Sequence, residues 1–496
     1  MPSRTRILRS VLLMLTILSF SIVCLHVAHI FSADSTSIYQ LSSRPWSYNV
    51  LSNGKEHEQK LYHQPIQDDH RILESLSNNM GFYNAIDAHN TGYKIMNPTL
   101  LELPPRDNIS HNFLIIARTP HISKRINGKD YRLARQVAMF ANLTYGKLGR
   151  PVLTTGKWAK LILEDFGEPE HHCKDQPRID RYIGPEDVKL FWTKAGEPLL
   201  IFTHQVKDKV LCQGQFIVDA RAAVPELERV LGQDVASSLP SIRYRYPKVL
   251  YRQPSEARKL QFQHQREKNW APVQSPFSHD TEVLFMVEPG KPFRLTSNDS
   301  FVVPITDTAG ELSSIKEPFP PGAQSSETWH STKGKTCMHD AMLHETQVHQ
   351  STPMLSVTLC NRGSCEPSTR NTVTIGMVQR RYDRPAAPYT WYDRRIAAYE
   401  AGPPYRMLSV SKKLTYHGET DGKYIWTGSM TYRSGTRYPP SNHGFLDDEV
   451  WLAFGIGDAA AGWLDIRASE LVTDHYLCQG SMQDHFTGVR GNVTLP

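Results

Sequence analysis

The chain of 496 residues has no large excess of charge of either sign. Its 56 lysines and arginines against 50 aspartates and glutamates leave a formal net charge of only +6. Proteins that bind nucleic acid usually carry a larger and more clustered basic excess, so we expect no nucleic-acid partner. The hydrophobic fraction of 40% is that of a globular protein. A small positive charge remains compatible with an anionic substrate.

Sustained helical periodicity is scarce, and the best candidates are residues 130–140 and 222–231. Short apolar runs separated by turn residues recur instead, which is typical of strands. These runs cover residues 113–118, 188–192, 199–205, 248–252, 283–288, 372–379, 406–414, 424–432, 450–454 and 462–466. The pattern predicts an all-β sandwich, barrel or propeller.

Metal and cofactor motifs are lacking. Residues 330–349 contain four histidines and one cysteine, but their spacing fits no closed zinc pattern. No Asp-x-Asp motif stands in a strand-loop context. The Gly455-Ile-Gly-Asp458 stretch lacks the third glycine and the following helix of a dinucleotide-binding loop. We therefore expect no metal and no cofactor.

Cysteine is rare, with seven residues in the chain. Cys24 lies in an apolar run, which leaves an even set of six with several alternative pairings. Cys360 and Cys365 flank a turn-rich Asn-Arg-Gly-Ser loop that a local disulfide could close.

The N-terminus has the longest apolar run. Residues 11–31 contain no Asp, Glu, Lys or Arg and follow Arg4, Arg6 and Arg9. The run is long enough to span a bilayer, and the arginines place residues 1–10 in the cytosol. A cleaved signal peptide is the rival interpretation, but its apolar region would be unusually long. We expect a type II membrane protein of the Golgi or another secretory-pathway membrane, with a luminal body.

The rest of the chain divides by composition. Residues 32–90 are polar and predict a stem, and residues 91–496 predict the luminal domain, with a Ser/Thr/Pro/Gly-rich insertion at about 303–370. Four sequons agree with a luminal body. They lie at Asn108, Asn142, Asn298 and Asn492.

Adjacent carboxylates, Glu186 and Asp187, follow a Gly184-Pro185 turn and lead into an apolar strand. Loops at strand ends commonly present chemistry. Neighbouring strand residues point to opposite faces, so one of the two carboxylates would face a given pocket. The simpler interpretation is a turn acid that caps local backbone amides.

Three other stretches are candidate site material. They are Glu267-Lys-Asn-Trp270, Phe454-Gly-Ile-Gly-Asp458, and Arg118 with Lys124 and Arg125. Lys268 and Asn269 could bind sugar or phosphate, and Trp270 could stack on a sugar ring. Small residues around Asp458 would permit close approach of a ligand. The structural alternatives are a core tryptophan, a tight turn and a solvated strand edge.

Taken in order, these motifs resemble those of five-bladed β-propeller enzymes acting on β-mannosides. That group includes glycoside hydrolase family 130 mannoside phosphorylases and related mannosyltransferases. The signal anchor with Gly-Pro-Glu-Asp and Glu-Lys-Asn-Trp is most similar to fungal β-1,2-mannosyltransferases of the cell wall. The resemblance spans roughly residues 91–470 and implies a five-bladed β-propeller behind the transmembrane helix and stem.

The resemblance also implies roles. Asp187 corresponds to the acid/base carboxylate of a Glu-Asp-Pro-Arg motif, with Glu186 beside it. Val188 and Lys189 replace the Pro and Arg, which keeps a positive charge but loses the bidentate guanidinium. The implied substrate-binding residues are Arg118, Arg125, Lys189, Lys268, Asn269, Trp270 and Asp458.

The expected activity is transfer of a β-mannosyl or related unit from a sugar nucleotide, possibly GDP-mannose, to a glycan or glycoprotein acceptor. Asp187 would then be the base on the acceptor hydroxyl, and cations would stabilise the phosphate leaving group. One rival is a β-mannoside phosphorylase or hydrolase. The other is an inactive glycan-binding propeller, which the loss of the Pro-Arg pair would explain.

Overall fold

The computed structural model describes twelve stretches of the chain. They are residues 70–105, 111–146, 149–163, 181–206, 213–252, 267–278, 282–296, 301–305, 348–383, 390–420, 423–433 and 441–477. Residues 1–31, residues 32–69 of the expected stem and the sequons at Asn108, Asn298 and Asn492 lie outside them. The stem was predicted to extend to residue 90, and this boundary is wrong, because residues 70–73 and 84–87 are strands of the folded domain. Within the described stretches, no helix combines the length and the apolar character that a membrane span requires.

The described chain is all-β, as predicted, and is built largely from antiparallel meanders of four strands. The first comprises β3 (Met96–Glu102), β4 (Phe113–Arg118), β7 (Gln136–Tyr145) and β8 (Pro151–Ala159). The second comprises β10 (Glu186–Trp192), β11 (Pro198–Gln205), β12 (Gln213–Asp219) and β13 (Lys248–Leu250). The third comprises β14 (Ala271–Val273), β15 (Leu284–Glu288), β16 (Lys291–Leu295) and β17 (Val302–Pro304).

Two further meanders belong to larger sheets. One comprises β19 (Leu355–Thr358), β20 (Thr372–Asp383), β21 (Thr390–Glu400) and β22 (Met407–Ser411). The same sheet holds β1 (His70–Leu73), β18 (Val348–Gln350), β23 (Lys413–Tyr416), β25 (His443–Phe445) and β28 (His475–Leu477). The other comprises β24 (Ile425–Tyr432), β26 (Glu449–Ile456) and β27 (Ala460–Arg467), to which β2 (Asn84–Asp87) adds.

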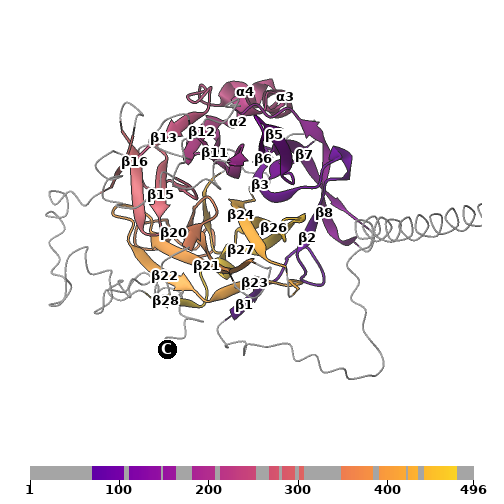
Figure 1. Cartoon of the computed structure of the whole chain (residues 1–496). Helices are drawn as coiled ribbons and strands as arrows, with labels where there is room; N and C mark the ends of the chain where they lie inside the picture. Colours follow the sequence, from indigo (N-terminus) through magenta and orange to yellow (C-terminus); the bar gives the residue numbers. More distant parts are fainter. Residues whose placement is uncertain are drawn as a thin grey trace, which may run out of the picture. The chain divides into compact units, whose positions relative to one another are not determined.

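Strand β2 joins the two ends of the described chain. It pairs antiparallel with β27 and parallel with β8, so that the first and last meanders form one eight-stranded sheet. Figure 1 shows the meanders following one another around the described part of the chain in the order of its colours. A remaining small sheet holds β5 (Ile122–Ile126), β6 (Lys129–Leu133) and β9 (Tyr182–Ile183).

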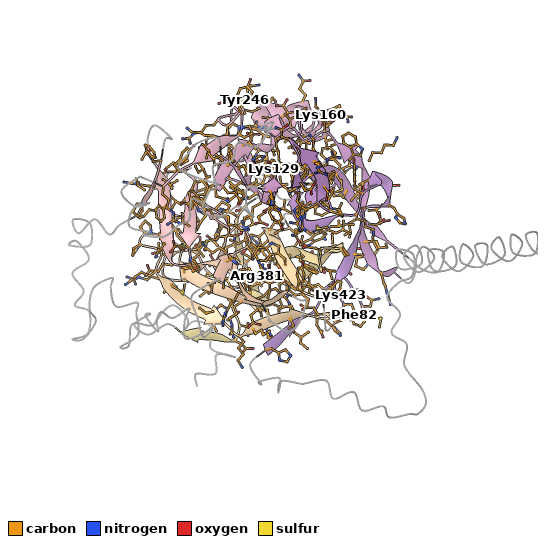
Figure 2. The ribbon with its side chains drawn as sticks, viewed as in Figure 1. Phe82, Lys129, Lys160, Tyr246, Arg381 and Lys423 are labelled. Carbon is orange, nitrogen blue, oxygen red and sulfur yellow. A yellow bond between two sulfur atoms is a disulfide. The ribbon has the colours of Figure 1, made fainter. Side chains whose placement is uncertain are left out.

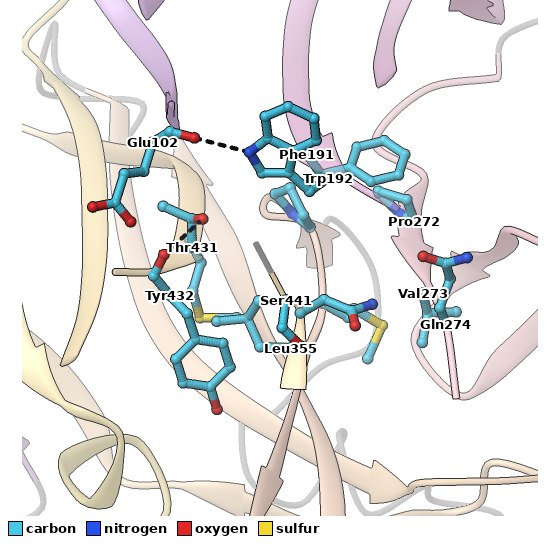
Figure 3. Close-up of a pocket in the computed structure, with 14 residues that line it drawn as sticks. Glu102, Phe191, Trp192, Pro272, Val273, Gln274, Leu355, Thr431, Tyr432 and Ser441 are labelled. Carbon is cyan, nitrogen blue, oxygen red and sulfur yellow. Dashed lines mark hydrogen bonds between the residues drawn. The ribbon is translucent and has the colours of Figure 1, made fainter. Parts of the chain in front are cut away.

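The first strands of the meanders, β3, β10, β14, β19 and β24, lie close together. The Leu190 amide of β10 donates to Thr99 Oγ1 of β3 at 3.0 Å, and the Leu100 amide of β3 donates to Ser429 Oγ of β24 at 3.2 Å. The far ends of β3, β10, β14 and β24 and the start of β19 line a single small pocket, shown in Figure 3. The residues of these strands in its wall include Glu102, Trp192, Pro272, Leu355 and Tyr432.

The strands form because their side chains are buried, often on both faces. All eight residues of β11 and all seven of β12 are buried. Such strands read as continuous apolar runs rather than as alternating patterns. The short helices α2 (Ala220–Ala223), α3 (Glu226–Leu231) and α4 (Gln233–Ser238) cover one edge of this meander and contribute Leu227 and Leu231 to its core.

Most sequence expectations for single elements are confirmed. The hairpin around Gly196 joins β10 to β11, and residues 222–231 lie within and between α2 and α3. The helix predicted at 130–140 is wrong, because β6 and the start of β7 occupy it. Asn127 and Gly128 both adopt positive φ and connect β5 to β6. An Asn-Gly pair is the strongest short hairpin signal and outweighs a helical pattern there.

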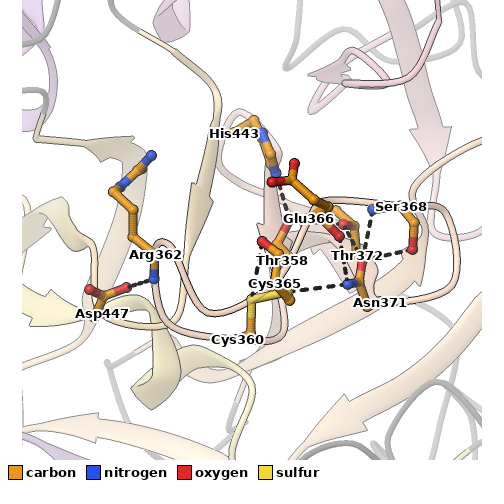
Figure 4. The surroundings of a disulfide bond; sticks show 10 residues. All are labelled: Thr358, Cys360, Arg362, Cys365, Glu366, Ser368, Asn371, Thr372, His443 and Asp447. Atoms are coloured by element: carbon orange, nitrogen blue, oxygen red, sulfur yellow. Dashed lines mark hydrogen bonds between the residues drawn. A yellow bond between two sulfur atoms is a disulfide. The ribbon is translucent and has the colours of Figure 1, made fainter.

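The expected insertion is described only in part. Residues 348–370 hold β18, β19 and the loop after them, whereas residues 306–347 lie outside the described stretches. The predicted disulfide between Cys360 and Cys365 is present, as Figure 4 shows. Within the loop that it closes, the Arg362 amide donates to Asp447 Oδ1 at 2.7 Å.

Asp465 on β27 holds the segment that leads into β2, and its removal is expected to lower the stability of the fold. Asp465 on β27 is 1% exposed; it accepts hydrogen bonds from the Ser75 hydroxyl and, at 2.9 Å, from the Ser77 amide. Replacing it by alanine leaves buried donors unpaired, which costs about 1–3 kcal/mol. We expect Asp465→Ala to lower the free energy of unfolding by that amount in denaturant titrations. The exposed Glu228→Gln is the control, with a change within about 0.5 kcal/mol. An Asp465→Ala protein as stable as the control would contradict this role.

Candidate active site

A tight turn places the two adjacent carboxylates. Gly184 has φ 103°, and a Cβ there would lie 2.1 Å from the Ala134 carbonyl oxygen. Only glycine fits this contact and this backbone region. Gln136 Nε2 also donates to the Pro185 carbonyl at 2.9 Å. The turn is therefore fixed against the start of β7, and Glu186 and Asp187 open β10 at a defined position.

The backbone is irregular where β10 begins. Asp187 has φ 51°, and the register with β11 shifts between Glu186 and Lys189. Glu186 lies against His121, with Oε1 3.6 Å from Nε2, whereas Asp187 lies against Lys268, with Oδ2 3.2 Å from Nζ. The adjacent carboxylates thus have different partners.

Asp187 is held ionised by several cations. Burial alone would raise its pKa, but Lys268, then Lys189 and Arg118, lower the pKa to about 2. Its side chain is 16% exposed, so the carboxylate remains within reach of a small ligand. For Glu186, burial also raises the pKa, and His121 and Lys268 outweigh it, so the pKa is again lowered.

Lys189 is the most deeply buried cation here, with 2% exposure. Burial lowers its pKa to about 8, while Asp187 opposes that shift and Lys268 adds to it. The residue that replaces the arginine of the resembling motif therefore lies inside the site. It places a positive charge beside Asp187 at neutral pH.

Asn269, which follows Lys268, contacts His349 on β18, a strand that pairs with β20 of the fourth meander. Asn269 has φ 64°, and its Nδ2 lies 3.0 Å from Nδ1 of His349 on β18. Burial, and then the charge on Lys268, lower the pKa of His349 to about 4, so this ring is neutral at pH 7. A neutral ring can accept the hydrogen bond from the Asn269 amide.

The last meander supplies Asp458. Arg118, at the end of β4, donates to Asp458 Oδ1 at 2.8 Å. Burial, and then a hydrogen bond to Asp458, raise the pKa of Tyr424 above its usual value, so its hydroxyl stays a donor. Tyr392 packs against Tyr424 and Trp426, with ring centroids 5.8 and 5.0 Å apart. These aromatic side chains provide an apolar wall next to the charged groups.

Several buried polar atoms around the site have no hydrogen-bond partner among the described residues. They are Asn97 Oδ1, Arg118 Nε and Asn269 Oδ1. Asn97 itself packs on Gly455, where a Cβ would lie 2.0 Å from its Oδ1. Unpaired buried polar atoms are rare in folded proteins, and a catalytic role or a bound water is a common reason for them.

The structure brings together most of the predicted site residues. Glu186, Asp187, Lys189, Lys268, Asn269, Arg118 and Asp458 interact as described above. Trp270 does not join them: it is 0% exposed, lies in a hydrophobic cluster and donates to Glu267 Oε2 at 3.2 Å. Its ring is a core element and has no face open to a sugar. Arg125 lies on the exposed hairpin β5–β6, apart from the carboxylates.

The remaining predicted residues have simpler surroundings. Asn142 lies half-buried on β7, and its Oδ1 accepts a hydrogen bond from the Asn112 amide at 3.0 Å. Sequence reasoning missed His121 and Tyr424 as site residues, and it assigned His349 to the insertion. Among the described residues, no group of three or more His, Cys, Asp or Glu side chains could hold a metal ion.

No protein-family model and no curated protein matches the chain. Distant likenesses exist among solved structures. One is to MPT-4, a mannose phosphorylase from Leishmania mexicana in complex with a phosphate ion, at 13% identity and a TM-score of 0.35, covering 81% of this chain and 90% of that one.

Two further solved structures show a similarly low identity and TM-score. The α-L-arabinofuranosidase PaAbf62A from Podospora anserina, in complex with cellotriose, has 10% identity and a TM-score of 0.34 over 79% of this chain and 97% of that one. MPT-1, a GDP-Man-dependent mannosyltransferase from Leishmania mexicana, has 11% identity and a TM-score of 0.31 over 77% and 89%.

The burial of Lys189 predicts a pH-dependent stability change. Its folded pKa of about 8 lies below the ordinary value of 10.5. Its charge therefore destabilises the fold below about pH 8, and the penalty fades as the pH rises toward 10.5. We expect Lys189→Met to raise the free energy of unfolding by roughly 3 kcal/mol at pH 7 and by little at pH 10.5. Denaturant titrations between pH 7 and pH 10.5 measure this change in the free energy of unfolding.

The control is the exposed Lys160→Met, for which no such pH trend is expected. A gain at pH 7 that persists unchanged at pH 10.5 would contradict the assignment.

Proposed function

We propose that the protein is a glycan-active enzyme that transfers a mannosyl or related unit from a sugar nucleotide to an acceptor hydroxyl. One observation carries the proposal: Asp187 stands at a strand entrance with Lys268 at 3.2 Å and with the charges of Lys189 and Arg118 acting on it. A carboxylate for proton transfer beside cations for a phosphate leaving group is the set of groups that such a reaction needs.

The ionisation of Asp187 suits a base and not a general acid. A general acid must hold a proton at working pH, and a pKa of about 2 leaves Asp187 unprotonated. As a base, it accepts the proton from the acceptor hydroxyl as that oxygen attacks the anomeric carbon of the donor. The bond from that carbon to the phosphate oxygen breaks, and the nucleoside diphosphate leaves with the electron pair. Lys268, Lys189 and Arg118 stabilise the charge that develops on it.

The remaining groups suit a sugar ring. The Asp458 carboxylate and Asn269 Oδ1 can accept hydrogen bonds from sugar hydroxyl groups. The half-buried Tyr392 offers apolar ring surface; it packs against the buried Trp426, whose ring lies 6.2 Å from that of His349, centroid to centroid. Carbohydrate sites combine such apolar walls with a few oriented polar groups. GDP-mannose is the first donor to test, because the motifs resemble those of mannoside enzymes.

We also propose that the five meanders are the blades of a five-bladed β-propeller. Their first strands all contribute to one pocket, and the candidate site is made where β3, β10 and β14 begin. Radially arranged four-stranded sheets around a central channel define that architecture. β2, which joins the last meander to the first, would close the ring.

The cellular setting belongs to the same proposal. The apolar run at 11–31 suits a signal anchor, and the Cys360–Cys365 disulfide suits an oxidising lumen. We propose a single-pass type II protein of a secretory-pathway membrane, with a luminal catalytic domain and no cofactor.

The test is a transfer assay on the purified full-length protein with GDP-mannose, other sugar nucleotides and mannoside acceptors. We expect transfer that falls by about 100-fold or more in Asp187→Asn, the range for loss of a catalytic proton-transfer group. The exposed Glu228→Gln is the matched control and should keep full activity.

Other outcomes discriminate the rivals. Phosphate-dependent release of mannose 1-phosphate from a β-mannoside, without transfer from any nucleotide, would make the protein a phosphorylase. Release of free mannose by water would make it a hydrolase. A folded protein that binds mannosides equally well with and without Asp187→Asn, and turns over none, would be a binding propeller.

A further inference from the structure

A small three-stranded sheet outside the five meanders begins next to the candidate site and extends away from it. It consists of the β5–β6 hairpin and β9, and β9 runs parallel to β6 with Tyr182 beside Arg132 and Ile183 beside Leu133. The residue after β9 is Gly184, whose turn presents Glu186 and Asp187. The register places Lys129, labelled in Figure 2, at the opposite end of β6 from Leu133, which pairs with Ile183 beside that turn.

One face of this sheet carries a continuous polar and aromatic row. The register places Ser123 opposite Arg132 and Arg125 opposite Asp130, so these side chains share a face with His121. His121 lies 3.6 Å from Glu186, and its ring lies 5.7 Å from that of Tyr182. We call His121, Arg125, Arg132 and Tyr182 the hairpin face.

The contacts along the hairpin face continue outward. Arg132 donates from its NH1 to the Tyr182 hydroxyl at 3.2 Å, and its guanidinium carbon lies 5.7 Å from the Tyr182 ring centre. Arg125 and Arg132 are both exposed, and Tyr182 is half-buried. Asp130 is the one carboxylate on this face of the described strands. From His121 to Arg125 the strand extends about 13 Å, which is enough for a short oligosaccharide.

The opposite face of the hairpin differs. It carries Lys124 opposite Tyr131, and Tyr131 is only 3% exposed. Ile122 and Leu133 also pair on that side, where Leu133 is half-buried and Ile122 is 40% exposed. Tyr131 packs this side into the fold, and the hairpin face with its two arginines is the side continuous with Glu186.

We propose that the hairpin face is an extended acceptor subsite for a glycan that carries an anionic substituent, a phosphate or a carboxylate, beyond the sugar that reacts. This proposal rests on the proposed transferase function and adds the class of acceptor. Arginine binds phosphate and carboxylate groups through paired hydrogen bonds. Tyr182 offers a ring surface to the intervening sugar.

The position of the hairpin face favours the acceptor over the donor. The donor phosphates must lie at the reacting carbon, where Lys268, Lys189 and Arg118 surround Asp187. The hairpin face instead starts at Glu186 and His121 and continues outward. An elongated acceptor whose terminal hydroxyl meets Asp187 extends along such a path.

Equilibrium binding tests this without requiring turnover. Isothermal titration of the full-length protein would compare a neutral mannotriose with the same mannotriose bearing one phosphate, or one carboxylate, at the end remote from the accepting sugar. We expect the acidic forms to bind about tenfold more tightly, the effect of one charge-assisted hydrogen bond. Arg132→Ser and Arg125→Ser should remove most of this preference, and Asp130→Asn should increase it. Lys124→Ser removes the same charge from the opposite face and should leave the preference unchanged.

These outcomes separate the subsite from the activity. The preference and its loss in the arginine variants would support the subsite even if no sugar nucleotide served as donor. Equal affinity for the neutral and acidic forms, or no binding of either, would overturn it. A preference that survives Arg132→Ser or falls equally in Lys124→Ser would overturn it too. Weaker binding of GDP-mannose in Arg132→Ser, with the acceptor preference intact, would assign the face to the donor instead.

Discussion

The contact between Asp187 and Lys268 is the interaction on which the account depends. It joins the start of β10 to the turn before β14, and both side chains are partly buried, with Lys268 31% and Asp187 16% exposed. A partly buried ion pair is a weak source of stability, because desolvation offsets the attraction between the charges. Lys189 adds a fully buried charge that disfavours folding below about pH 8. Concentrated charge that does not stabilise the fold is typical of functional sites, where stability is sacrificed for chemistry.

Backbone geometry explains how the sheets present these groups. Asn97, Asp187 and Asn269 stand at or just before the first strands of three successive meanders, and each has positive φ. Asp458, in the turn between β26 and β27, does as well. Asn and Asp tolerate this region better than other non-glycine residues. At each position, the chain turns a polar side chain out of the regular strand alternation. Backbone strain of this kind clusters at ligand sites, and here it recurs where the meanders meet.

The sequence predicted the parts of this arrangement that local chemistry determines. The carboxylates Glu186 and Asp187 were predicted from the Gly184-Pro185 turn before an apolar strand. Lys268, the cation that contacts Asp187, was predicted from the charged stretch at residues 267–269. The all-β class followed from short apolar runs. The helix expected at 130–140 failed because the Asn127-Gly128 turn signal was not weighed.

Other features could not be read from the chain alone, because they depend on contacts distant in sequence. His349 reaches Asn269 across 80 positions and Arg118 reaches Asp458 across 340. From the sequence alone, Trp270 could either stack on a sugar or pack in the core. The structure shows that it packs in the core, because its side chain is fully buried against Phe285. The position of Lys189 beside Asp187 likewise required the strand irregularity at the start of β10.

The pH dependence of kcat/KM for transfer, compared between the natural protein and Lys268→Met, tests the central claim most directly. If Asp187 is the base and Lys268 is the main cation that lowers its pKa, removing Lys268 raises that pKa. The acid limb of the profile then moves to higher pH by about one unit or more, whatever the change in absolute rate. An acid limb that stays in place while the rate falls would show that Lys268 only binds substrate and that another group takes the proton.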